Sequence, residues 1–392
     1  MSSEGWGDGS YLWGWAVTVV QGVAVLCASG ILLVWIVYPM LMGCLAAQRR
    51  HRCASEIRAI VDPPPSVSVI IATRDDAATV CERVADCLRA AHDPNRFEVI
   101  VGVDAQSNVA LHDIECAPNV HVVRGDEPGG KAATLNAAAR AAAGELLLFT
   151  DAQQRFEAGA IGRLAAAFGD DRVGAASGRL ELSESAKRSP VGRYWSYERW
   201  IRRCEATFSS CVGATGAIWA LRRSLWKPLP AALILDDVYA PMRVVLAGLR
   251  VVFVDDARAV DLRRADPAHE YRRKVRTLTG IVQLCCWLPQ LLVPARNPIW
   301  AQFIFHKLLR LLTPYWLIGL ATWGAVLVLH WVESNPVVTT VPLLAFAALG
   351  TLLRSRVARV VRRSVVWGVS LQFALVVATV NGLRRRWDVW SA

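Results

Sequence analysis

Acidic side chains stand directly after three short apolar runs of the sequence. The carboxylates at these positions are Asp75, Asp76, Asp104 and Asp151. If the runs are parallel strands, their carboxyl ends meet at one sheet edge, where the carboxylates would repel one another unless cations or hydrogen-bond donors fill the space. A phosphate ester with Mg²⁺ or Mn²⁺ is the simplest filling, because these ions prefer hard oxygen ligands. The alternative is that these residues are helix caps and turn residues.

A further acidic pair, Asp236-Asp237, follows the apolar run 231–235 and precedes a segment with helical spacing. Carboxylates at the start of a helix are stabilised by the helix dipole, so the pair also has an explanation that involves no chemistry. A membrane receptor or scaffold, however, would need neither this pair nor acids after three strands.

The apolar runs that precede the carboxylates alternate with segments of helical spacing. We predict strands at 67–72, 97–103, 120–123 and 146–150, and helices at 77–91 and 132–143. Strands that alternate with helices indicate an α/β domain with an open, doubly wound and mostly parallel sheet. Ligands of such sheets bind beyond the carboxyl ends of the strands, which is where the carboxylates stand.

The N-terminal part of the chain has no charged residue from Gly9 to Gln48. About 20 apolar residues suffice to cross a bilayer, so this run contains a membrane-spanning helix. Arginines follow at once from Arg49, whereas the first ten residues contain acids and no Lys or Arg. The positive-inside rule then predicts an N-terminus outside and a cytoplasmic domain after the helix.

Three further uncharged stretches lie near the C-terminus, at 311–332, 334–353 and 364–383. Each is long enough to cross a bilayer. Arginines 384–386 follow the last stretch, on the side that the positive-inside rule assigns to the outside. Either this tail is an exception, or one stretch lies along the interface, and the sequence leaves the number of spans open.

The composition divides the chain into four parts. Residues 1–48 hold the first membrane helix, and residues 57–266 form a soluble domain in which charges return and apolar runs shorten to strand length. Residues 267–310 are predicted to form amphipathic interfacial helices, basic first and apolar after. Residues 311–392 hold about three C-terminal membrane helices.

The charge balance points to lipid rather than nucleic acid. Lys and Arg number 44 against 33 Asp and Glu, which gives a net charge of +11. Many arginines stand at the ends of the membrane stretches, where anionic lipid explains them better than a nucleic acid does. No G-x-G-x-x-G follows the first strand, which argues against a dinucleotide-binding oxidoreductase.

Eight segments between residues 65 and 315 together resemble the family 2 glycosyltransferases, the GT-A fold enzymes that include cellulose, chitin and hyaluronan synthases. In chain order they are VSVIIATRDDAATV, VIVGVDAQS, GGKAATLNAA, LLFTDAQQ, GATGAIWALRRSL, ILDDVYAPMRVVLAGLRVVFVDDA, EYRRKVRTLTG and WAQFIFHKLLRLLTP. Each segment alone is a weak signal, whereas their order and spacing are specific. The resemblance implies a transferase of the hexosyltransferase type with a UDP-sugar donor and Mg²⁺ or Mn²⁺ as cofactor.

The resemblance assigns the donor site to residues from several segments. The residues implied to contact the nucleotide or its phosphates are Thr73, Asp76, Asp104, Lys131, Asp151, Arg273 and Arg276. The implied metal ligands are Asp151 and Gln153, and Gln153 replaces the second Asp of the family's motif, which removes one charge. For the basic run 272–276 an alternative is contact with anionic lipid at the membrane surface.

The resemblance also implies a catalytic base and an acceptor site. Asp237, beside Asp236, matches the base that deprotonates the acceptor hydroxyl. A single base without a separate nucleophile implies one displacement and inversion of the anomeric configuration. Thr215, Gly216 and Ala217 match the acceptor segment, although a tight turn at a strand end explains them equally well.

The nature of the product stays open at the sequence level. Processive synthases carry a Trp after the motif's Arg, and Thr277 takes that place here. Transfer of one or a few sugars to a lipid-linked acceptor therefore fits as well as synthesis of a polysaccharide. The implied location is the inner membrane of a bacterium, multi-pass and with the catalytic domain in the cytoplasm. Asp75, Gln153 and Thr277 differ from the residues of the family's motifs. A catalytically degenerate member that acts as a membrane scaffold or depends on a partner is therefore an alternative.

Overall fold

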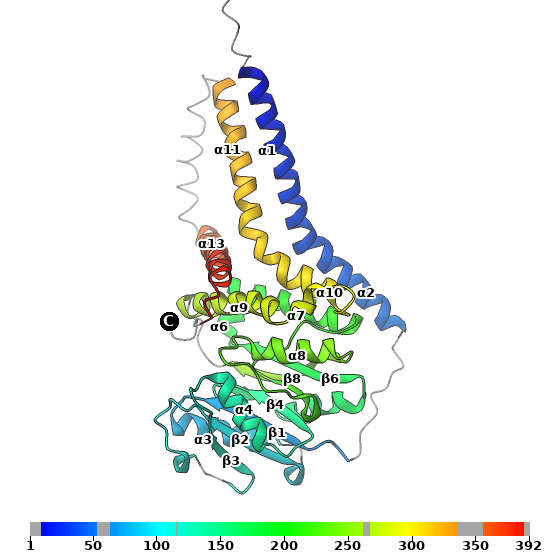
Figure 1. Cartoon of the computed structure of the whole chain (residues 1–392), viewed down its shortest axis with the longest axis vertical. Helices are drawn as coiled ribbons and strands as arrows, with labels where there is room; N and C mark the ends of the chain where they lie inside the picture. Colours follow the sequence, from blue (N-terminus) through cyan, green and yellow to red (C-terminus); the bar gives the residue numbers. More distant parts are fainter. Residues whose placement is uncertain are drawn as a thin grey trace, which may run out of the picture.

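One eight-stranded sheet lies at the centre of the α/β part of the molecule (Figure 1). The computed structural model describes residues 9–52, 63–91, 93–114, 117–187, 189–261, 267–334 and 356–387. The strands are β1 (Val67–Thr73), β2 (Phe97–Val103), β3 (Val120–Arg124), β4 (Leu146–Thr150), β5 (Gln154–Phe156), β6 (Val173–Leu182), β7 (Trp219–Arg222) and β8 (Arg250–Asp261). Their order across the sheet is β3-β2-β1-β4-β7-β6-β8-β5.

The first half of the sheet is parallel, as the sequence predicts. Strand β1 pairs in parallel with β2 and β4, and β2 pairs in parallel with β3. In the second half, β7 inserts antiparallel between β4 and β6, while β6 and β8 run parallel to each other. The prediction of a mostly parallel, GT-A-like sheet is confirmed, and the antiparallel insertion is a feature that the sequence did not reveal.

Helices cover both faces of the sheet. They are α3 (Ala77–Ala90), α4 (Lys131–Ala141), α5 (Ala160–Ala165), α6 (Glu184–Lys187), α7 (Pro190–Phe208), α8 (Asp236–Leu246) and α9 (Pro267–Trp287), with short 3₁₀ turns at Pro94–Arg96, Leu111–Asp113, Ala166–Gly169 and Arg223–Leu225. Alternate residues of β1 enter opposite cores, because side chains alternate across a strand. Ile70 packs in the core that contains α4, α8 and α9, whereas Val69 and Ile71 pack in the core that contains α3 and α5.

Two long apolar helices leave this domain side by side (Figure 1). The first is α1 (Gly9–Leu32), which continues through a π-helical turn (Leu33–Val37) into α2 (Tyr38–Arg52), and the second is α11 (Thr313–Ser334). Together with α13 (Arg356–Leu383), the described residues contain three helices long and apolar enough to cross a membrane. The predicted stretch 334–353 lies, apart from its first residue, outside the described residues.

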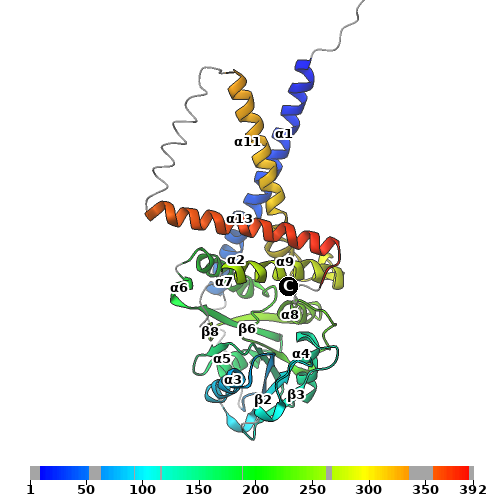
Figure 2. The same cartoon turned by 90° about the vertical axis from the view of Figure 1, so that its left-hand side faces the viewer.

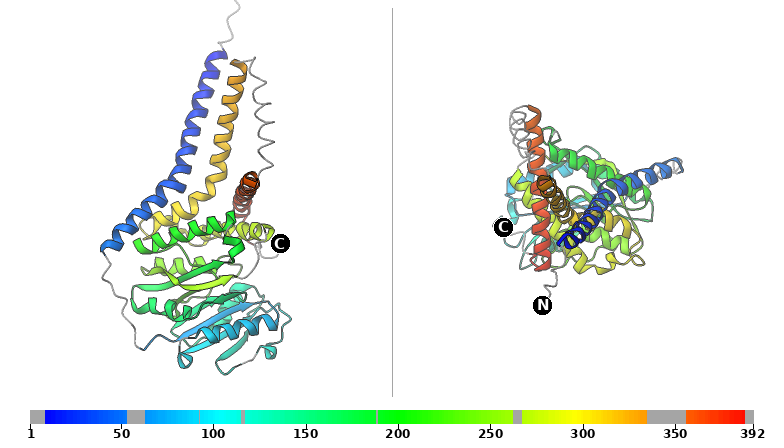
Figure 3. Two further views of the ribbon diagram at one scale, coloured as in Figure 1. Left: turned by 180° about the vertical axis from the view of Figure 1, so that it is seen from behind. Right: turned by 90° about the horizontal axis from the view of Figure 1, so that it is seen from above.

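Helix α13 lies crosswise to α1 and α11, as Figure 2 shows and the view from above in Figure 3 repeats. It rests on α9, where a Cβ on Gly382 would come 2.3 Å from Val282, so only glycine allows this close approach. The ring of Trp367 on α13 also lies 5.6 Å from that of Tyr194 on α7. Length and composition would let α13 cross a bilayer, but its direction differs from that of the other two helices.

A layer of helices separates the sheet from the long apolar helices (Figure 1). It contains α7, α9, α10 (Trp300–Gln302), a π-helical turn (Phe303–Leu308) and 3₁₀ turns at Pro289–Leu292 and Leu309–Leu312. Helix α2 docks on α7 through Tyr38, Met42 and Ala46, which pack against Ile201 and Cys204. The N-terminal apolar segment is thereby joined to the same body as the sheet.

Candidate active site

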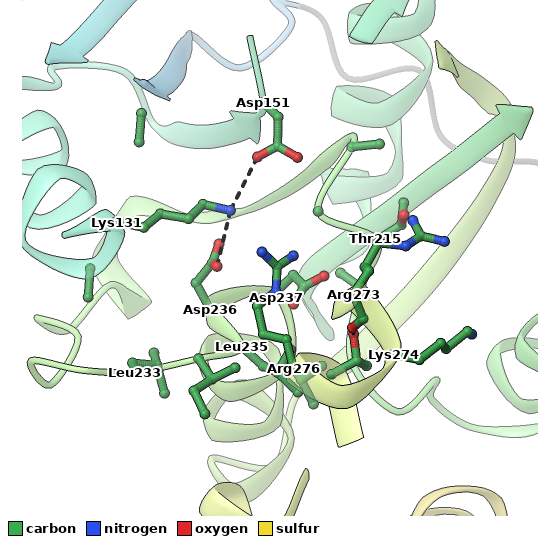
Figure 4. A pocket seen from close by; sticks show the side chains of 18 of the residues that line it. Lys131, Asp151, Thr215, Leu233, Leu235, Asp236, Asp237, Arg273, Lys274 and Arg276 are labelled. Atoms are coloured by element: carbon green, nitrogen blue, oxygen red, sulfur yellow. Dashed lines mark hydrogen bonds and ion pairs between the residues drawn. The ribbon is translucent and has the colours of Figure 1, made fainter. Parts of the chain in front are cut away.

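A cavity of about 880 Å³ begins at the carboxyl ends of β1, β2 and β4 and extends past the first turn of α8 to α9. Figure 4 shows some of the side chains that line it. This volume is within the range of small-molecule and cofactor sites. Its lining includes all but one of the residues that the sequence assigns to the site: Thr73, Asp104, Lys131, Asp151, Gln153, Thr215, Gly216, Ala217, Asp236, Asp237, Arg273 and Arg276. The exception is Asp76.

Asp104, at the end of β2, is held as an oriented carboxylate. Its Oδ2 accepts a hydrogen bond from the Gly130 backbone N–H at 2.7 Å, its Oδ1 accepts one from the Gln106 N–H at 2.9 Å, and the Arg74 Nε lies 3.2 Å from Oδ2. Burial raises the pKa of Asp104, but these donors outweigh it, so the pKa lies below its usual value. Asp104 is therefore a fixed acceptor at the cavity wall.

The turn that approaches Asp104 requires glycine. Gly129 and Gly130 have φ values of +93° and +98°, in the region that disfavours residues with a Cβ. A Cβ on Gly129 would also lie 3.0 Å from Asp104 Oδ1. This turn opens α4, whose first residue is Lys131, so one loop supplies both the N–H to Asp104 and the lysine of the site.

The loop after β1 divides between the cavity and a helix cap. Thr73 Oγ1 accepts a hydrogen bond from the Asp75 N–H at 2.9 Å, and both residues line the cavity. Asp76 instead caps α3, where its carboxylate accepts bonds from the Thr79 N–H and hydroxyl at 2.9 Å each. The first cause of the lowered pKa of Asp76 is that backbone hydrogen bond. Its proposed contact with the nucleotide stays a prediction.

Lys131 joins two acidic loops that are distant in the sequence. Its Nζ lies 3.2 Å from Asp151 Oδ1 and 3.2 Å from Asp236 Oδ1 (Figure 4). Burial alone would lower the pKa of Lys131, but Asp151 and Asp236 more than offset it and the pKa is raised. The ammonium group thus stays charged and provides the counter-ion that the clustered carboxylates need.

Asp151 and Gln153 offer oxygen ligands for a divalent cation, beside Asp75. Asp151 is well exposed to the cavity, and the Gln153 amide nitrogen donates to Asp75 Oδ1 at 3.3 Å. The described residues contain no group of three or more His, Cys, Asp or Glu able to enclose a metal. Magnesium is usually held by one or two carboxylates with substrate phosphates completing its shell, so this sparse set fits a metal that binds with a diphosphate.

Asp237 is an acid of the cavity whose pKa is raised. It lies in the first turn of α8, and burial first, then repulsion from Asp236, raise its pKa to about 6, although Lys131 and Arg202 act in the opposite direction. A carboxyl group of pKa near 6 is ionised at neutral pH and accepts a proton more readily than an ordinary Asp. This combination suits a general base.

The loop before β7 is fixed against Asp237. The Ala214 N–H donates to the Asp237 carbonyl at 2.7 Å, and the Thr215 N–H donates to Ser177 Oγ at 3.0 Å. A Cβ on Gly216 would lie 3.3 Å from Asp237 Oδ2. Glycine at this position leaves room beside the Asp237 carboxylate, and Thr215 and Ala217 flank that room.

The two arginines predicted for the donor site differ in their surroundings. Arg276, on α9, reaches toward the acidic cluster beside Asp237 (Figure 4), and burial lowers its pKa while Asp237 raises it. Arg273, one turn earlier, lies 2.8 Å from Glu270 Oε2 and 4.8 Å above the Trp195 ring. Arg276 therefore faces the reacting end of the cavity, whereas Arg273 faces α7.

Further lining residues were not predicted from the sequence. They come from α7, α9 and the chain around α10 and α11: Tyr194, Trp195, Glu198, Arg202, Lys274, His306, Lys307 and Arg310. Lys274 and Lys307 lie in segments that carry the family resemblance, and lysine is scarce in this chain. These two features together could have identified them as site residues from the sequence. Arg202 lies in an ordinary helical pattern, and only the packing of α7 brings it to the cavity.

Comparisons with known proteins agree with this geometry. The family model for glycosyltransferase-like family 2 matches residues 63–280, more than half of the chain. A search among curated proteins finds no match. Among solved structures, the mannosyltransferase PcManGT from Pyrobaculum calidifontis, in complex with GDP-Man and Mn²⁺, matches with a TM-score of 0.65 and 20% identity over 94% of this chain and 99% of that one.

A second solved structure, a mycobacterial protein, matches with a TM-score of 0.40 and 14% identity over 62% of this chain and 78% of that one, too weakly to carry an argument. The resemblance to PcManGT supports the GT-A-like fold, and the family model covers the strands, glycine turn and acidic loops that build the cavity. The chain belongs to the family 2 glycosyltransferases and is a glycosyltransferase.

Proposed function

We propose that this enzyme transfers a sugar from a nucleoside diphosphate sugar to an acceptor hydroxyl with inversion, at the cytoplasmic face of a membrane. The observation that carries the proposal is the placement of Asp237. It is a partly buried acid of raised pKa in the cavity that also holds Asp104 and Asp151. One cavity thus combines groups suited to a nucleotide, a diphosphate and a proton acceptor.

Donor binding would use the loops at the sheet edge. Asp104 is an ionised acceptor for nucleotide N–H or ribose hydroxyl groups, and the glycine turn before Lys131 lets the backbone approach the phosphates. Asp151 and Gln153 would hold Mg²⁺ or Mn²⁺, which neutralises diphosphate charge when bound. Lys131 and Arg276 add fixed positive charge, because guanidinium and ammonium groups pair well with phosphate oxygens.

The transfer would be a single displacement. Asp237 takes the proton of the acceptor hydroxyl while that oxygen attacks the anomeric carbon, and the bond to the diphosphate breaks on the opposite side. Lys131 and Arg276 stabilise the negative charge that develops on the leaving diphosphate. Gly216 keeps the space beside the Asp237 carboxylate open for the acceptor.

The donor nucleotide is proposed to be UDP, as the family resemblance implies. PcManGT was solved with GDP-Man, so a guanosine donor is the direct rival. The acceptor is proposed to be a glycan or a lipid-linked sugar, because the cavity extends to Trp35 in the first apolar segment. We place the enzyme in a bacterial inner membrane, anchored by the apolar helices of the chain.

The test is nucleotide release by the purified, detergent-solubilised chain. UDP- and GDP-sugars would be supplied one at a time with Mn²⁺ or Mg²⁺ and a membrane lipid extract. We expect release with one donor, loss of release on metal chelation, and loss in both Asp237→Asn and Asp151→Ala. Absence of release with every donor, together with absence of nucleotide and Mn²⁺ binding, would contradict the proposal and favour a degenerate or partner-dependent protein.

A further inference from the structure

The end of the cavity nearest the apolar helices is rich in positive charge. The cationic side chains that line it are Arg202, Arg273, Lys274, Lys307 and Arg310, with His306 beside them. They come from α7, α9 and the chain before α11, so three separate elements converge there. This end is distinct from the Asp104 and Asp151 end, where the donor is proposed to bind.

Carboxylates neutralise these cations only in part. Glu198 serves three of them at once: Lys307 Nζ lies 3.3 Å and His306 Nε2 3.1 Å from its Oε2, and Arg310 bonds to its Oε1. Glu270 serves two, with Arg273 at 2.8 Å and Lys274 at 4.0 Å.

The third carboxylate, Glu205, is occupied by His306 Nδ1 at 2.8 Å and the Tyr38 hydroxyl at 2.6 Å. Arg202 makes no hydrogen bond or ion pair with any residue the structure describes, and its Nε is buried without a partner. Five Lys and Arg side chains therefore face three carboxylates, and the Arg202 guanidinium forms an ion pair with none of the three, although its charge acts on Asp237.

The distribution of lysine strengthens this picture. The chain has five lysines among its 44 basic residues, and three of them line the cavity: Lys131, Lys274 and Lys307. The other two, Lys187 and Lys227, are exposed. Burial, and then repulsion from Arg273, lower the pKa of Lys274 to about 8, although Glu270 raises it. The charged form of Lys274 is therefore disfavoured in this cluster. An anion in the cavity would relieve this repulsion.

Apolar side chains border the same end of the cavity. Leu371 and Leu375 come from α13, Leu278 and Ile281 from α9, and Trp35 from the turn that ends α1. Two of the contributing segments, around Trp35 and on α13, are long and apolar enough to cross a membrane. An anion that binds here can therefore carry a hydrocarbon chain into apolar surroundings.

We propose that this end of the cavity binds the phosphate linkage of a lipid-anchored acceptor whose terminal sugar hydroxyl reaches Asp237. The inference rests on the proposed sugar transfer and names the acceptor's chemical class. A sugar hydroxyl must lose its proton to a base when it attacks, whereas a phosphate is already ionised. The hydroxyl is therefore the nucleophile, and the phosphate serves only to bind the acceptor. Two lipids share this chemistry: a glycan on an isoprenoid diphosphate, and a phosphoglycolipid.

The proposal is tested by comparing three acceptors that carry the same terminal sugar: a polyprenyl diphosphate glycan, a phosphoglycolipid and a neutral alkyl glycoside. The variants are Arg202→Gln and Lys307→Gln, and the matched control is Lys227→Gln, which removes an exposed lysine outside the cavity. We expect KM to rise on the order of tenfold for one or both phosphate acceptors in the two cavity variants. KM for the neutral acceptor and for the donor should stay unchanged.

Arg202→Gln guards against a folding artefact, since it removes no ion pair, whereas Lys307→Gln breaks the contact with Glu198. A rise in KM that is equal for the neutral acceptor would overturn the inference and assign the cluster a structural role. A rise in donor KM alone would assign it to the donor diphosphate and overturn the inference as well. The acceptor with the larger effect identifies which lipid is used.

Direct binding separates this inference from the proposed function. Affinity for a short polyprenyl diphosphate in detergent would be measured without donor, so catalysis is not required. We expect the unaltered chain to bind the probe and Arg202→Gln to bind it on the order of tenfold more weakly. No binding by the unaltered chain overturns the inference even if nucleotide release is observed, and binding without release keeps it while the transfer proposal fails.

Discussion

Asp237 shows how the surroundings of one residue set its chemistry. Its neighbour Asp236 is buried and forms an ion pair with Lys131, whereas Asp237 is only partly buried, and desolvation together with repulsion from Asp236 raises the pKa of Asp237 to about 6. Two consecutive acids thus have different environments, which is how proteins assign different roles to similar groups. Asp236 is paired with the lysine, and Asp237 is the proposed proton acceptor.

Asp237→Asn should lower the turnover rate by about 10²–10⁴-fold, because an amide cannot act as the general base. Nucleotide affinity should change little, since Asp104 and the glycine turn are untouched. The measurement is kcat with donor KM, beside Asp256→Asn, an exposed acid outside the cavity lining. Turnover within a few-fold of the unaltered enzyme would remove Asp237 from the mechanism.

The pH dependence of kcat/KM should follow Asp237. This parameter reports the free enzyme, so it should fall about tenfold per unit below pH 6 and level off above it. Asp236→Asn should move the acid limb to lower pH, because Asp236 raises the pKa of Asp237. An acid limb that stays in place in Asp236→Asn would show that another group titrates.

The raised pKa of Asp237 also predicts that ionisation of this residue lowers the stability of the fold. The folded pKa of Asp237 is raised above its usual value of 3.8, so protonation favours the fold, and that contribution is lost as pH rises through about 6. Asp237→Asn should therefore unfold at a temperature no lower than the unaltered enzyme at pH 8. Thermal melts at pH 5 and pH 8 would check this, and a lower melting temperature for the variant at pH 8 would contradict it.

At the scale of elements, the glycine turn before α4 orients residues of the proposed donor site. Gly130 has a φ of +98° and donates its N–H to Asp104, yet a Cβ at this position would meet nothing within 4 Å. A substitution there would thus lower the free energy of unfolding only through backbone conformation, by about 1–2 kcal/mol.

Gly130→Ala should raise the donor KM, because relaxation of φ moves the N–H that orients Asp104. Gly248→Ala is the matched control: Gly248 has a φ of +85°, equally open space and no place in the cavity lining. Both variants should lose similar stability, and only Gly130→Ala should lose donor affinity. Equal KM values in the two variants would exclude a role for this turn in donor binding.

The elements that the sequence predicted are those with strong local patterns. Strands β1, β2 and β4 are continuous apolar runs, α3 has helical spacing and α4 is rich in alanine, so residues at their ends could be placed at one sheet edge. Strands β5 and β7 have only three and four residues, too few for a periodic signal. The position of β7 depends on pairing with β4 and β6, which no local pattern encodes.

The residues of the candidate site likewise fall into those that the sequence could identify and those that only the tertiary structure shows. Asp104 and Asp151 follow strands, so the fold class was enough to place them at one sheet edge, whereas Lys131 and the role of Asp237 came from the family resemblance. Arg202 is in the middle of α7, and its place in the cavity comes from tertiary packing alone.

At the scale of the molecule, the direction of α13 bears on how the enzyme would lie in a membrane. It lies crosswise to α1 and α11, rests on α9 and contributes Leu371 and Leu375 to the cavity. Its opposite side exposes large apolar residues, among them Val366, Val369 and Phe373. We propose that α13 lies along the membrane surface, which would explain arginines 384–386 without a span that ends outside.

A depth measurement in nanodiscs would check this orientation. Spin labels at Phe373 on α13 and at Leu26 on α1, both well exposed, should differ: the α1 label should reach the hydrocarbon centre and the α13 label should stay near the headgroups. Equal depths for the two labels would mean that α13 crosses the bilayer.

The configuration of the product tests the base-assisted single displacement most directly. The sugar transferred from the identified donor would be examined by NMR for its anomeric configuration, in parallel with Asp237→Asn. We predict a new glycosidic bond of opposite configuration to the donor's, formed by the unaltered enzyme and not by the variant. Retention of configuration, or equal product from Asp237→Asn, would contradict the single displacement and the role of Asp237.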